Sequence, residues 1–388
     1  MAEKTYHFEQ GPIRPPNEAR SLLLRITRNC TWNKCLFCPV YKKEIFSRRS
    51  VEEIVRDIQT VRNIKNDISN LSKSLGFDGD INDQIIKTVF SQSSAHVNSC
   101  YKSITLWMYY GTGACFLQDA DNLVMNTKDL VHILTFLLKN IPEITRITTY
   151  SRSKTILTKS VNDLAEIRKA GLNRVHIGLE TGYDPLLTFM QKGVNSQQHI
   201  EAGKKLIEAG IEVSEYVMPG LGGQEMWREH AIHTAEVINR INPHYIRLRS
   251  LRIPENVPLF KKCISGKFTA QTDDSVVEEI KLFVQTLENI HSTITSDHIM
   301  NLLEEISGKM PGDRHKILNT IEKYQALPLN DRFIFRIGRR LGYYRSLNDI
   351  HHDRELHKQI QVLVNEIKIK QGTDGLEKFI TETADRSI

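Results

Sequence analysis

The hydrophobic positions between residues 22 and 251 follow two periods in turn, that of a strand and that of a helix. Short β-rich runs predict strands, and the stretches between them carry apolar residues three and four positions apart, which predicts amphipathic helices. The predicted strands are Leu22–Thr27, Ser103–Met108, Ile144–Thr149, Arg174–Leu179, Glu212–Val217 and Tyr245–Leu251. The predicted helices are Val51–Val61, Thr127–Lys139, Val161–Ala170, Ser196–Ala209 and Met226–Arg240. Strands that alternate with helices in this way are expected to run parallel, with right-handed crossovers.

Six strand–helix units are too few for a closed eight-stranded barrel. We therefore expect an α/β fold with an open, partial (βα)6 TIM-like barrel over residues 21–255, and its chemistry at the carboxyl edge of the strands. Residues 1–20 form an N-terminal segment, and the polar segment 63–102, rich in Ser, Asn and Asp, is interpreted as an insertion. Helical periodicity dominates residues 256–388, which predicts a helical C-terminal extension. Its expected helices are Asp274–Ile306, Asp313–Tyr324 and Asp353–Ile369.

Composition places the 388-residue chain among globular proteins, with 40% hydrophobic and 25% charged residues. The excess of 52 Lys and Arg over 46 Asp and Glu gives a net charge of only +6, which gives little reason to expect a nucleic-acid partner. The N-terminus lacks the apolar region of a signal peptide, and no apolar run approaches the ~20 residues of a membrane span. These features predict a cytoplasmic protein without a membrane span. They exclude a disordered chain, collagen, a coiled coil and a secreted disulfide scaffold.

Three of the six cysteines, Cys30, Cys35 and Cys38, form a C-x4-C-x2-C loop directly after the first predicted strand. In a reducing compartment such a group points to metal, and each thiolate can ligate one iron of a cluster. A structural zinc site needs a fourth ligand, for which His96 and Cys100 are the nearest later candidates. A plant-type 2Fe–2S ferredoxin shares the spacing but needs a fourth cysteine, and buried structural thiols rarely gather in such a loop. We therefore expect a cluster with three protein ligands and one open iron.

The loop resembles that of the radical S-adenosylmethionine (SAM) superfamily, in the branch of Elongator-, methylthiotransferase- and coproporphyrinogen-oxidase-like radical domains. In that family the three-cysteine loop follows the first strand of a partial (βα)6 barrel, and an aromatic residue, here Phe37, precedes the last cysteine. The commonest family spacing is C-x3-C-x2-C, so this chain has one extra residue in the first gap. The resemblance covers roughly residues 20–255. It implies a 4Fe–4S cluster, SAM bound to the open iron, oxygen sensitivity and an external electron donor of the flavodoxin or ferredoxin type.

The resemblance also implies which side chains contact SAM. Glu180 matches the residue near the SAM ribose, and Lys192 matches the residue near its carboxylate. On their own, Glu180 could be a solvated residue at a strand end and Lys192 a residue favoured by a helix dipole. In the turn after the second strand, Asp119 stands where the family has glycines, and it could equally cap a helix. The full set of implied contacts is Phe37, Gln118, Asp119, Ser151, Glu180, Lys192, Tyr216 and Leu248.

Two further groups of residues lie in the C-terminal extension. Residues 332–345 hold five arginines and four aromatic residues, which suit a nucleic-acid surface but more often form an amphipathic helix with a solvated basic face. In Ser296-Asp297-His298, either Asp297 caps a helix or His298 is a proton donor or substrate ligand, a weak candidate for catalysis. The dispersed cysteines are interpreted as small buried hydrophobic residues: Cys100, Cys115 and Cys263.

The expected function is that of a radical SAM enzyme. It would cleave SAM reductively to a 5′-deoxyadenosyl radical, which abstracts hydrogen from a small or medium-sized, anionic substrate. A primary radical must be shielded from water, so the extension is expected to close over the substrate, with His298 and Arg332–Arg345 supplying polar and cationic groups. Two alternatives remain open: an enzyme that modifies tRNA or another macromolecule, and a SAM- and cluster-binding haem chaperone without strong catalysis.

Overall fold

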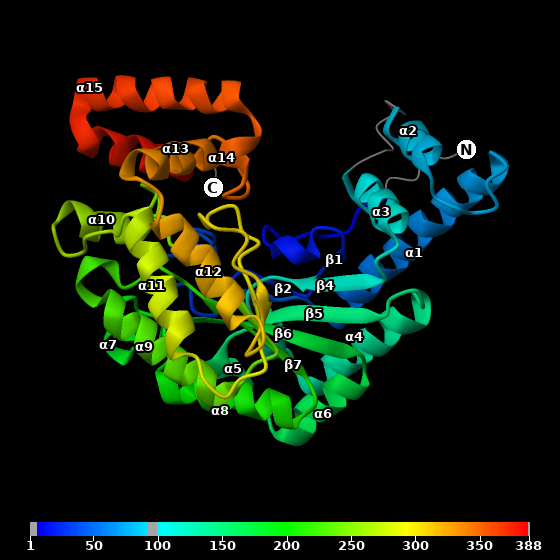
Figure 1. The fold of residues 1–388 in the computed structure, drawn as a ribbon. Helices are drawn as coiled ribbons and strands as arrows, with labels where there is room; N and C mark the ends of the chain where they lie inside the picture. The colour runs from blue at the N-terminus through cyan, green and yellow to red at the C-terminus, as the bar shows by residue number, and fades with distance from the viewer. Residues whose placement is uncertain (1–5, 92–98, 387–388) are drawn as a thin grey trace. The chain divides into compact units, whose positions relative to one another are not determined.

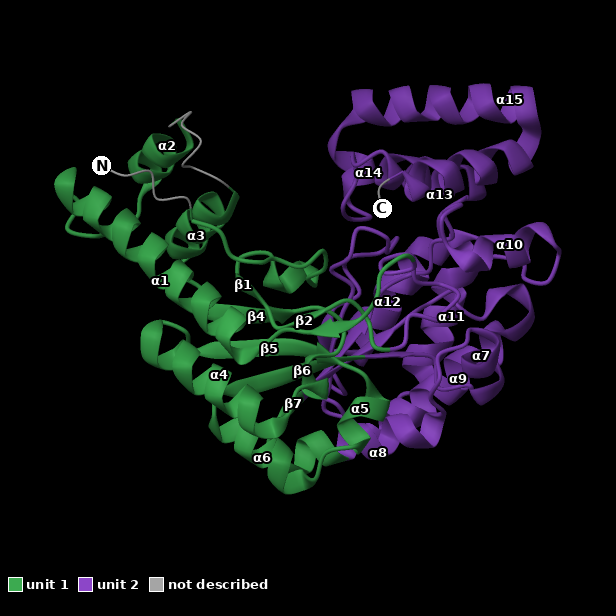
Figure 2. Cartoon of the chain, turned by 180° about the vertical axis from the view of Figure 1, so that it is seen from behind, with its two compact units in different colours: residues 1–31, 43–177, 205–212 green, residues 32–42, 178–204, 213–388 purple. Residues whose placement is uncertain are grey.

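The computed structural model describes residues 6–91 and 99–386, which divide into two compact units (Figure 2). Unit 1 comprises Met1–Thr31, Lys43–Ile177 and Lys205–Glu212. Unit 2 comprises Trp32–Lys42, Gly178–Lys204 and Val213–Ile388. The cysteine loop therefore contributes Cys30 to unit 1, and Cys35 and Cys38 to unit 2.

Unit 1 contains parallel strands in the order β1-β4-β5-β6 (Figure 1). Their bounds are Leu22–Arg25, Ala114–Gln118, Arg146–Ser151 and Leu172–Glu180, and the last residues of β6 belong to unit 2. The register places Leu22 opposite Cys115 and Tyr150 opposite His176. A two-residue pair, β2 (Thr27–Arg28) with β3 (Ser47–Arg48), is antiparallel.

The helices of unit 1 are α1 (Val51–Ser74), α2 (Asp83–Ser91), α3 (Ser99–Tyr110), α4 (Thr127–Asn140), α5 (Ser153–Leu157) and α6 (Val161–Lys169), with 3-10 turns η1 (Pro16–Glu18) and η2 (Asn122–Val124). Helix α1 begins at a capping box, in which Ser50 and Glu53 each satisfy the other's backbone N–H. Its apolar stripe, which includes Ile54, Ile58 and Val61, is fully buried. Helix α4 packs against both α1 and α6.

Unit 2 contains strands in the order β7-β8-β9-β10. Strands β7, β8 and β9 are parallel, and β10 pairs with β9 in the antiparallel direction. These strands are Glu212–Val217, Tyr245–Leu248, Thr293–Thr295 and Gly308–Lys309. The helices are α7 (Asp184–Phe189), α8 (Ser196–Glu208), α9 (Gly223–Ile241), α10 (Pro258–Ile264), α11 (Asp273–Thr286), α12 (Arg314–Gln325), α13 (Leu329–Arg340), α14 (Asp349–His352) and α15 (Arg354–Asp385). Helix α15 lies along α13, and Gly372 interrupts its helical backbone (Figure 1).

These elements confirm the predicted fold class: parallel strands joined by helices as in a partial (βα)6 barrel, followed by a region rich in helices. None of the described helices is long and apolar enough to cross a lipid bilayer.

Two predicted elements are wrong. Residues Ser103–Met108 belong to helix α3, because Cys100, Ile104 and Trp107 recur at helical spacing and are buried; the second strand is β4. The polar segment 63–102 contains the second half of α1, helix α2 and the start of α3 in its described part, and its interpretation as an insertion stays a prediction. The expected helix Asp274–Ile306 ends at Thr286, and the β-branched run Thr293–Thr295 adds strand β9.

Candidate active site

In unit 2, the cysteine loop is anchored on the end of α7 and the residues after it. The indole Nε1 of Trp32 donates to the carbonyl of Gln191 at 2.7 Å, and the Leu36 amide donates to the Met190 carbonyl at 3.0 Å. Lys42 closes the loop, because its Nζ donates to the Cys35 carbonyl at 2.6 Å and to a second loop carbonyl at 3.0 Å. Sequence reasoning missed this lysine.

Apolar side chains surround the same part of the loop. Cys35 and Cys38, both half-buried, pack against a buried cluster that includes Phe37. The other members of this cluster are Leu36, Leu186, Met190, Leu221, Val257, Leu259 and Phe268. Two cysteine sulfurs at an apolar wall fit the donor set and low-polarity surroundings of an iron–sulfur cluster.

Glu180 and Lys192, which the sequence placed twelve residues apart, form an ion pair in unit 2. Lys192 Nζ donates to Glu180 Oε1 at 3.0 Å and lies 5.5 Å from the centre of the Phe37 ring. Glu180 ends β6 with a backbone φ of 63°, a left-handed conformation that non-glycine residues rarely adopt and that marks many functional positions. Gly178 leaves room for the pair, since a Cβ there would overlap the Glu180 carboxylate and lie 2.9 Å from Lys192 Nζ. The structure thus brings together Phe37, Glu180 and Lys192.

In unit 1, two aspartates after β4 hold the residues on either side of Cys30. Asp119 Oδ2 accepts from the Asn29 amide at 3.1 Å and from Arg25 Nε at 2.6 Å. Asp121, fully buried, accepts from the Thr31 hydroxyl at 2.7 Å. The loop after β4 therefore positions the backbone at the first cysteine. The spacing Asp-x-Asp directly after a strand was the available sequence signal for Asp121.

Two other expected SAM contacts have structural partners in unit 1. The Gln118 side chain accepts from the Gly11 amide at 2.8 Å and donates to the Gly11 carbonyl at 2.9 Å, which ties the N-terminal segment to the end of β4. The Ser151 hydroxyl donates to Asp121 Oδ1 at 2.8 Å. Both side chains thus support the loops at the carboxyl ends of their strands.

Strand β7 carries a carboxyl group that sequence reasoning passed over. Glu215 is fully buried, and across the described residues neither of its carboxyl oxygens has a hydrogen-bond partner. Burial raises the pKa of Glu215 well above its usual range; Lys192 opposes this shift and Glu180 adds to it. The sequence of β7 did not predict that Glu215 is buried, because five consecutive residues from Val213 to Val217 are buried and no alternation marks an exposed face.

The remaining expected contacts of unit 2 lie on or near β7 and β8. Tyr216 is opposite Arg247 in the β7–β8 register, and Leu248 is buried at the end of β8. Asn301 fixes that end, since its Nδ2 donates to the Leu248 carbonyl at 2.8 Å.

His298, the weak candidate for catalysis, accepts through Nδ1 from the Met300 amide at 3.2 Å. Burial, with help from Arg249, lowers the pKa of His298 to about 4. His298 is therefore neutral near pH 7 and poorly suited to be the proton donor. Among the described residues no helix directly follows Asp297, so the alternative that Asp297 caps a helix is wrong.

The basic stretch 332–345 is helical as far as Arg340, the end of α13, but the predicted solvated basic face is wrong. Arg336, Arg339 and Arg340 of α13 are all buried. Arg340 donates to Asp273 at 2.6 Å, and Arg336 is ion-paired with Asp273 and with Glu377 of α15. These arginines hold helices together, which removes most of the cationic groups expected to face an anionic substrate.

The dispersed cysteines behave largely as expected. Cys100 and Cys115 are buried, and burial raises the pKa of Cys115 well above that of an ordinary thiol. Cys263 is half-buried, and burial raises its pKa as well. His96 lies outside the described residues, among which no three His, Cys, Asp or Glu side chains gather as for a single metal ion.

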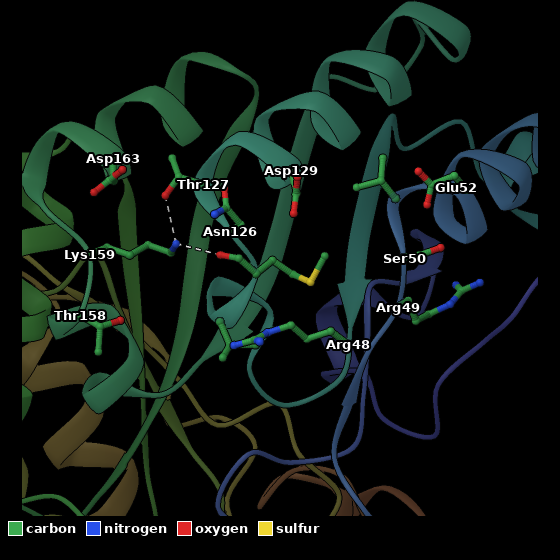
Figure 3. Close-up of a pocket in the computed structure, with 13 residues that line it drawn as sticks. Arg48, Arg49, Ser50, Glu52, Asn126, Thr127, Asp129, Thr158, Lys159 and Asp163 are labelled. Atoms are coloured by element: carbon green, nitrogen blue, oxygen red, sulfur yellow. Dashed lines mark hydrogen bonds between the residues drawn. The ribbon is translucent and has the colours of Figure 1, made fainter.

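A cavity of about 680 Å³ in unit 1 lies among the starts of α1, α4 and α6 (Figure 3). Lys159 reaches across it and donates to the Met125 carbonyl at 2.9 Å, beside Thr127 and Asp163. None of the expected site residues lines this cavity, so its size alone does not make it the active site.

Comparisons with known proteins match part of the chain. Residues 108–235 match the family model described as the radical SAM superfamily. A tRNA uridine(34) acetyltransferase of Methanocaldococcus jannaschii is 24% identical over 119 residues, which are 30% of this chain and 22% of that protein. The Methanocaldococcus infernus protein of the same name is 22% identical over 31% of this chain and 23% of that protein. The chain thus spans less than a quarter of the length of these curated relatives.

Two solved structures resemble the chain at lower identity. The archaeal Methanocaldococcus infernus Elp3 with an N-terminal deletion is 15% identical, with a TM-score of 0.41 over 55% of each chain. Coproporphyrinogen III oxidase (HemN) from Escherichia coli is 10% identical, with a TM-score of 0.37 over 95% of this chain and 91% of that one.

Proposed function

We propose that the chain is a radical SAM enzyme, in keeping with the match of residues 108–235 to the radical SAM family model. In this proposal Cys30, Cys35 and Cys38 hold a 4Fe–4S cluster, and Glu180 and Lys192 bind SAM beside it. The observation that carries the proposal is the packing of the loop of Cys35 and Cys38 against the segment bearing Lys192. A 4Fe–4S cluster held by these cysteines would supply the electron for the reductive cleavage of SAM.

The residues of this chain have separable roles in the proposal. Lys192 offers an ammonium group to the SAM carboxylate, and Glu180 offers carboxylate oxygens to hydroxyl groups of the ligand. Phe37 and its apolar neighbours keep water from the cysteine sulfurs. Asp119 and Asp121 set the backbone on either side of Cys30. The Glu180–Lys192 ion pair keeps both charges compensated.

The substrate proposed first is a small or medium-sized molecule from which hydrogen is abstracted. The low net charge of +6 supports it over a free nucleic acid. The anionic character of the substrate now rests on weaker support, because the arginines of α13 are paired. Closure of the C-terminal region over the substrate remains part of this proposal.

A tRNA is the second candidate substrate. It is favoured by one observation: both curated relatives are named tRNA uridine(34) acetyltransferase. Their matched part is less than a quarter of each protein. The expectation of no nucleic-acid partner gains no support from these comparisons.

Product analysis tests the proposal. Anaerobically reconstituted protein with SAM and dithionite should release 5′-deoxyadenosine and methionine, and Cys38→Ala should release neither. Cys263→Ala is the matched control, because Cys263 packs against the same apolar cluster but lies outside the loop; this variant should behave as the wild type.

The same assay separates the candidate substrates. A metabolite extract free of RNA should stimulate the release of 5′-deoxyadenosine if the substrate is a small molecule, and total tRNA should stimulate it if the substrate is a tRNA. Tetrapyrrole binding with little SAM cleavage would instead support the haem chaperone.

A further inference from the structure

Glu215 of β7 is fully buried. Neither oxygen of its carboxyl group has a hydrogen-bond partner in the described part of the chain. A buried carboxylate without hydrogen bonds is far costlier than the neutral acid, so the group is protonated in this state. A neutral carboxyl has one O–H donor and a carbonyl acceptor, and both lack partners here.

Leaving such a group unsatisfied costs the fold about 1–3 kcal/mol. A leucine of similar size on this strand would avoid that cost. Native chains keep few such groups, and those they keep often serve a ligand or catalysis.

The surroundings of Glu215 indicate which ligand it serves. The charged groups acting on it are Lys192 and Glu180, the pair assigned above to SAM. Lys192 donates to Glu180 at 3.0 Å, and no hydrogen bond joins it to the Glu215 carboxyl among the described residues. A group bound beside this pair would meet a neutral acid that can donate.

We propose that Glu215 belongs to the SAM subsite and donates a hydrogen bond from its neutral carboxyl to an uncharged acceptor atom of the ligand, beside the Glu180–Lys192 pair. This inference rests on the proposed function. It adds a recognition group of a different kind from the ion pair: a donor without charge. Deprotonation of Glu215 would remove the donor and place a second negative charge near Glu180, so affinity should fall as pH rises through its raised pKa.

The test compares two variants of the reconstituted holoprotein by anaerobic titration with SAM. Glu215→Gln keeps an N–H donor and should bind SAM within roughly threefold of the wild type, but without the loss of affinity at high pH. Glu215→Leu keeps the volume without the donor and should bind roughly tenfold more weakly. Glu212→Gln, on the same strand but paired with Arg174 near the surface, is the control and should bind as the wild type.

Thermal unfolding separates recognition from a structural role. Because Glu215→Leu removes an unsatisfied buried polar group, its Tm should equal or exceed that of the wild type. A lower Tm with unchanged SAM affinity would mean that Glu215 only supports the fold, for instance through an internal water, and would overturn the inference. Affinity that rises with pH in the wild type would also overturn it, because a cationic ligand group would then be the partner. Wild-type protein that fails to cleave SAM under reduction would refute the proposed function itself.

Discussion

At the scale of single residues, the ion pair of Glu180 and Lys192 depends on a position with no side chain. Gly178 lies two residues before Glu180 on β6, and its φ is not in the left-handed region. Its role is therefore to provide space, and the atoms that fill this space are the ends of two flexible side chains.

Replacement of Gly178 by alanine should displace the pair without unfolding the chain. A Cβ at this position would push the Glu180 carboxylate and Lys192 Nζ aside, since both side chains can rotate. We expect SAM affinity to fall roughly tenfold, as for the loss of one charge-assisted hydrogen bond, with Tm nearly unchanged. Gly312→Ala is the control, because its nearest neighbour would be an ordinary 3.8 Å from the new Cβ. Equal SAM affinity in both variants would contradict this role.

A second prediction at this scale concerns His298. Burial and Arg249 lower its pKa to about 4, against about 6.5 in an unfolded chain. The unfolded chain therefore binds more protons between these values, so His298 costs stability as pH falls from about 6.5 to about 4. NMR of histidine-labelled protein, with the signal assigned by His298→Gln, should show no titration above about pH 5. A midpoint near 6.5 would show that the ring is solvated and restore it as a candidate proton donor.

At the scale of elements, most strands and helices could be predicted because their periods are unambiguous. Strand β7 has the predicted bounds, and α4 and α6 differ from theirs by one residue. Helix α3 was missed because Ile104, Leu106 and Met108 also fit strand alternation, whereas Cys100, which begins the helical stripe continued by Ile104 and Trp107, precedes the predicted strand.

The residues of the candidate site also differ in how far they could be predicted from the sequence. Cys30, Cys35 and Cys38 could be picked out because they gather directly after a predicted strand. Glu180 and Lys192 could be picked out only through the resemblance to the radical SAM superfamily. Contacts that depend on tertiary packing could not be predicted. The hydrogen bonds of Lys42 to loop carbonyls and the unsatisfied carboxyl of β7 are examples, since neither leaves a period in the sequence.

Helix α13 offers a test of its structural role. Burial alone would raise the pKa of Asp273, but Arg340, Arg252 and Arg336 lower it well below its usual range. Asp273→Asn would leave these arginines without their buried carboxylate and should reduce the free energy of unfolding by about 3–5 kcal/mol near pH 7. The difference from wild type should shrink as pH falls below about 4, where the unfolded carboxyl protonates.

Denaturant unfolding of the two proteins measures this difference. Asp374→Asn, on the exposed surface of α15, is the control and should unfold as the wild type. If Asp273→Asn cost no stability, the arginines of α13 would be available for substrate, and the original expectation of a cationic lid would regain its support.

At the scale of the whole molecule, the C-terminal region contributes strands β9 and β10 as well as helices. Strand β9 pairs with β8, with Thr293 opposite Tyr245, and Asn301 binds the end of β8. Deletion from residue 256 would remove both. We therefore predict that the truncated chain loses the fold of unit 2 and its iron together with substrate turnover, as measured by circular dichroism and iron content. A truncated chain that keeps its cluster and loses only turnover would support a separable lid.

The central claim is that Cys30, Cys35 and Cys38 are the protein ligands of a 4Fe–4S cluster. The direct measurement is iron and sulfide per chain after anaerobic reconstitution, in the wild type and in the variant with all three cysteines changed to alanine. The account predicts about four of each in the wild type and almost none in the variant, while Cys263→Ala keeps the full complement. A triple variant that still binds about four irons per chain would contradict it.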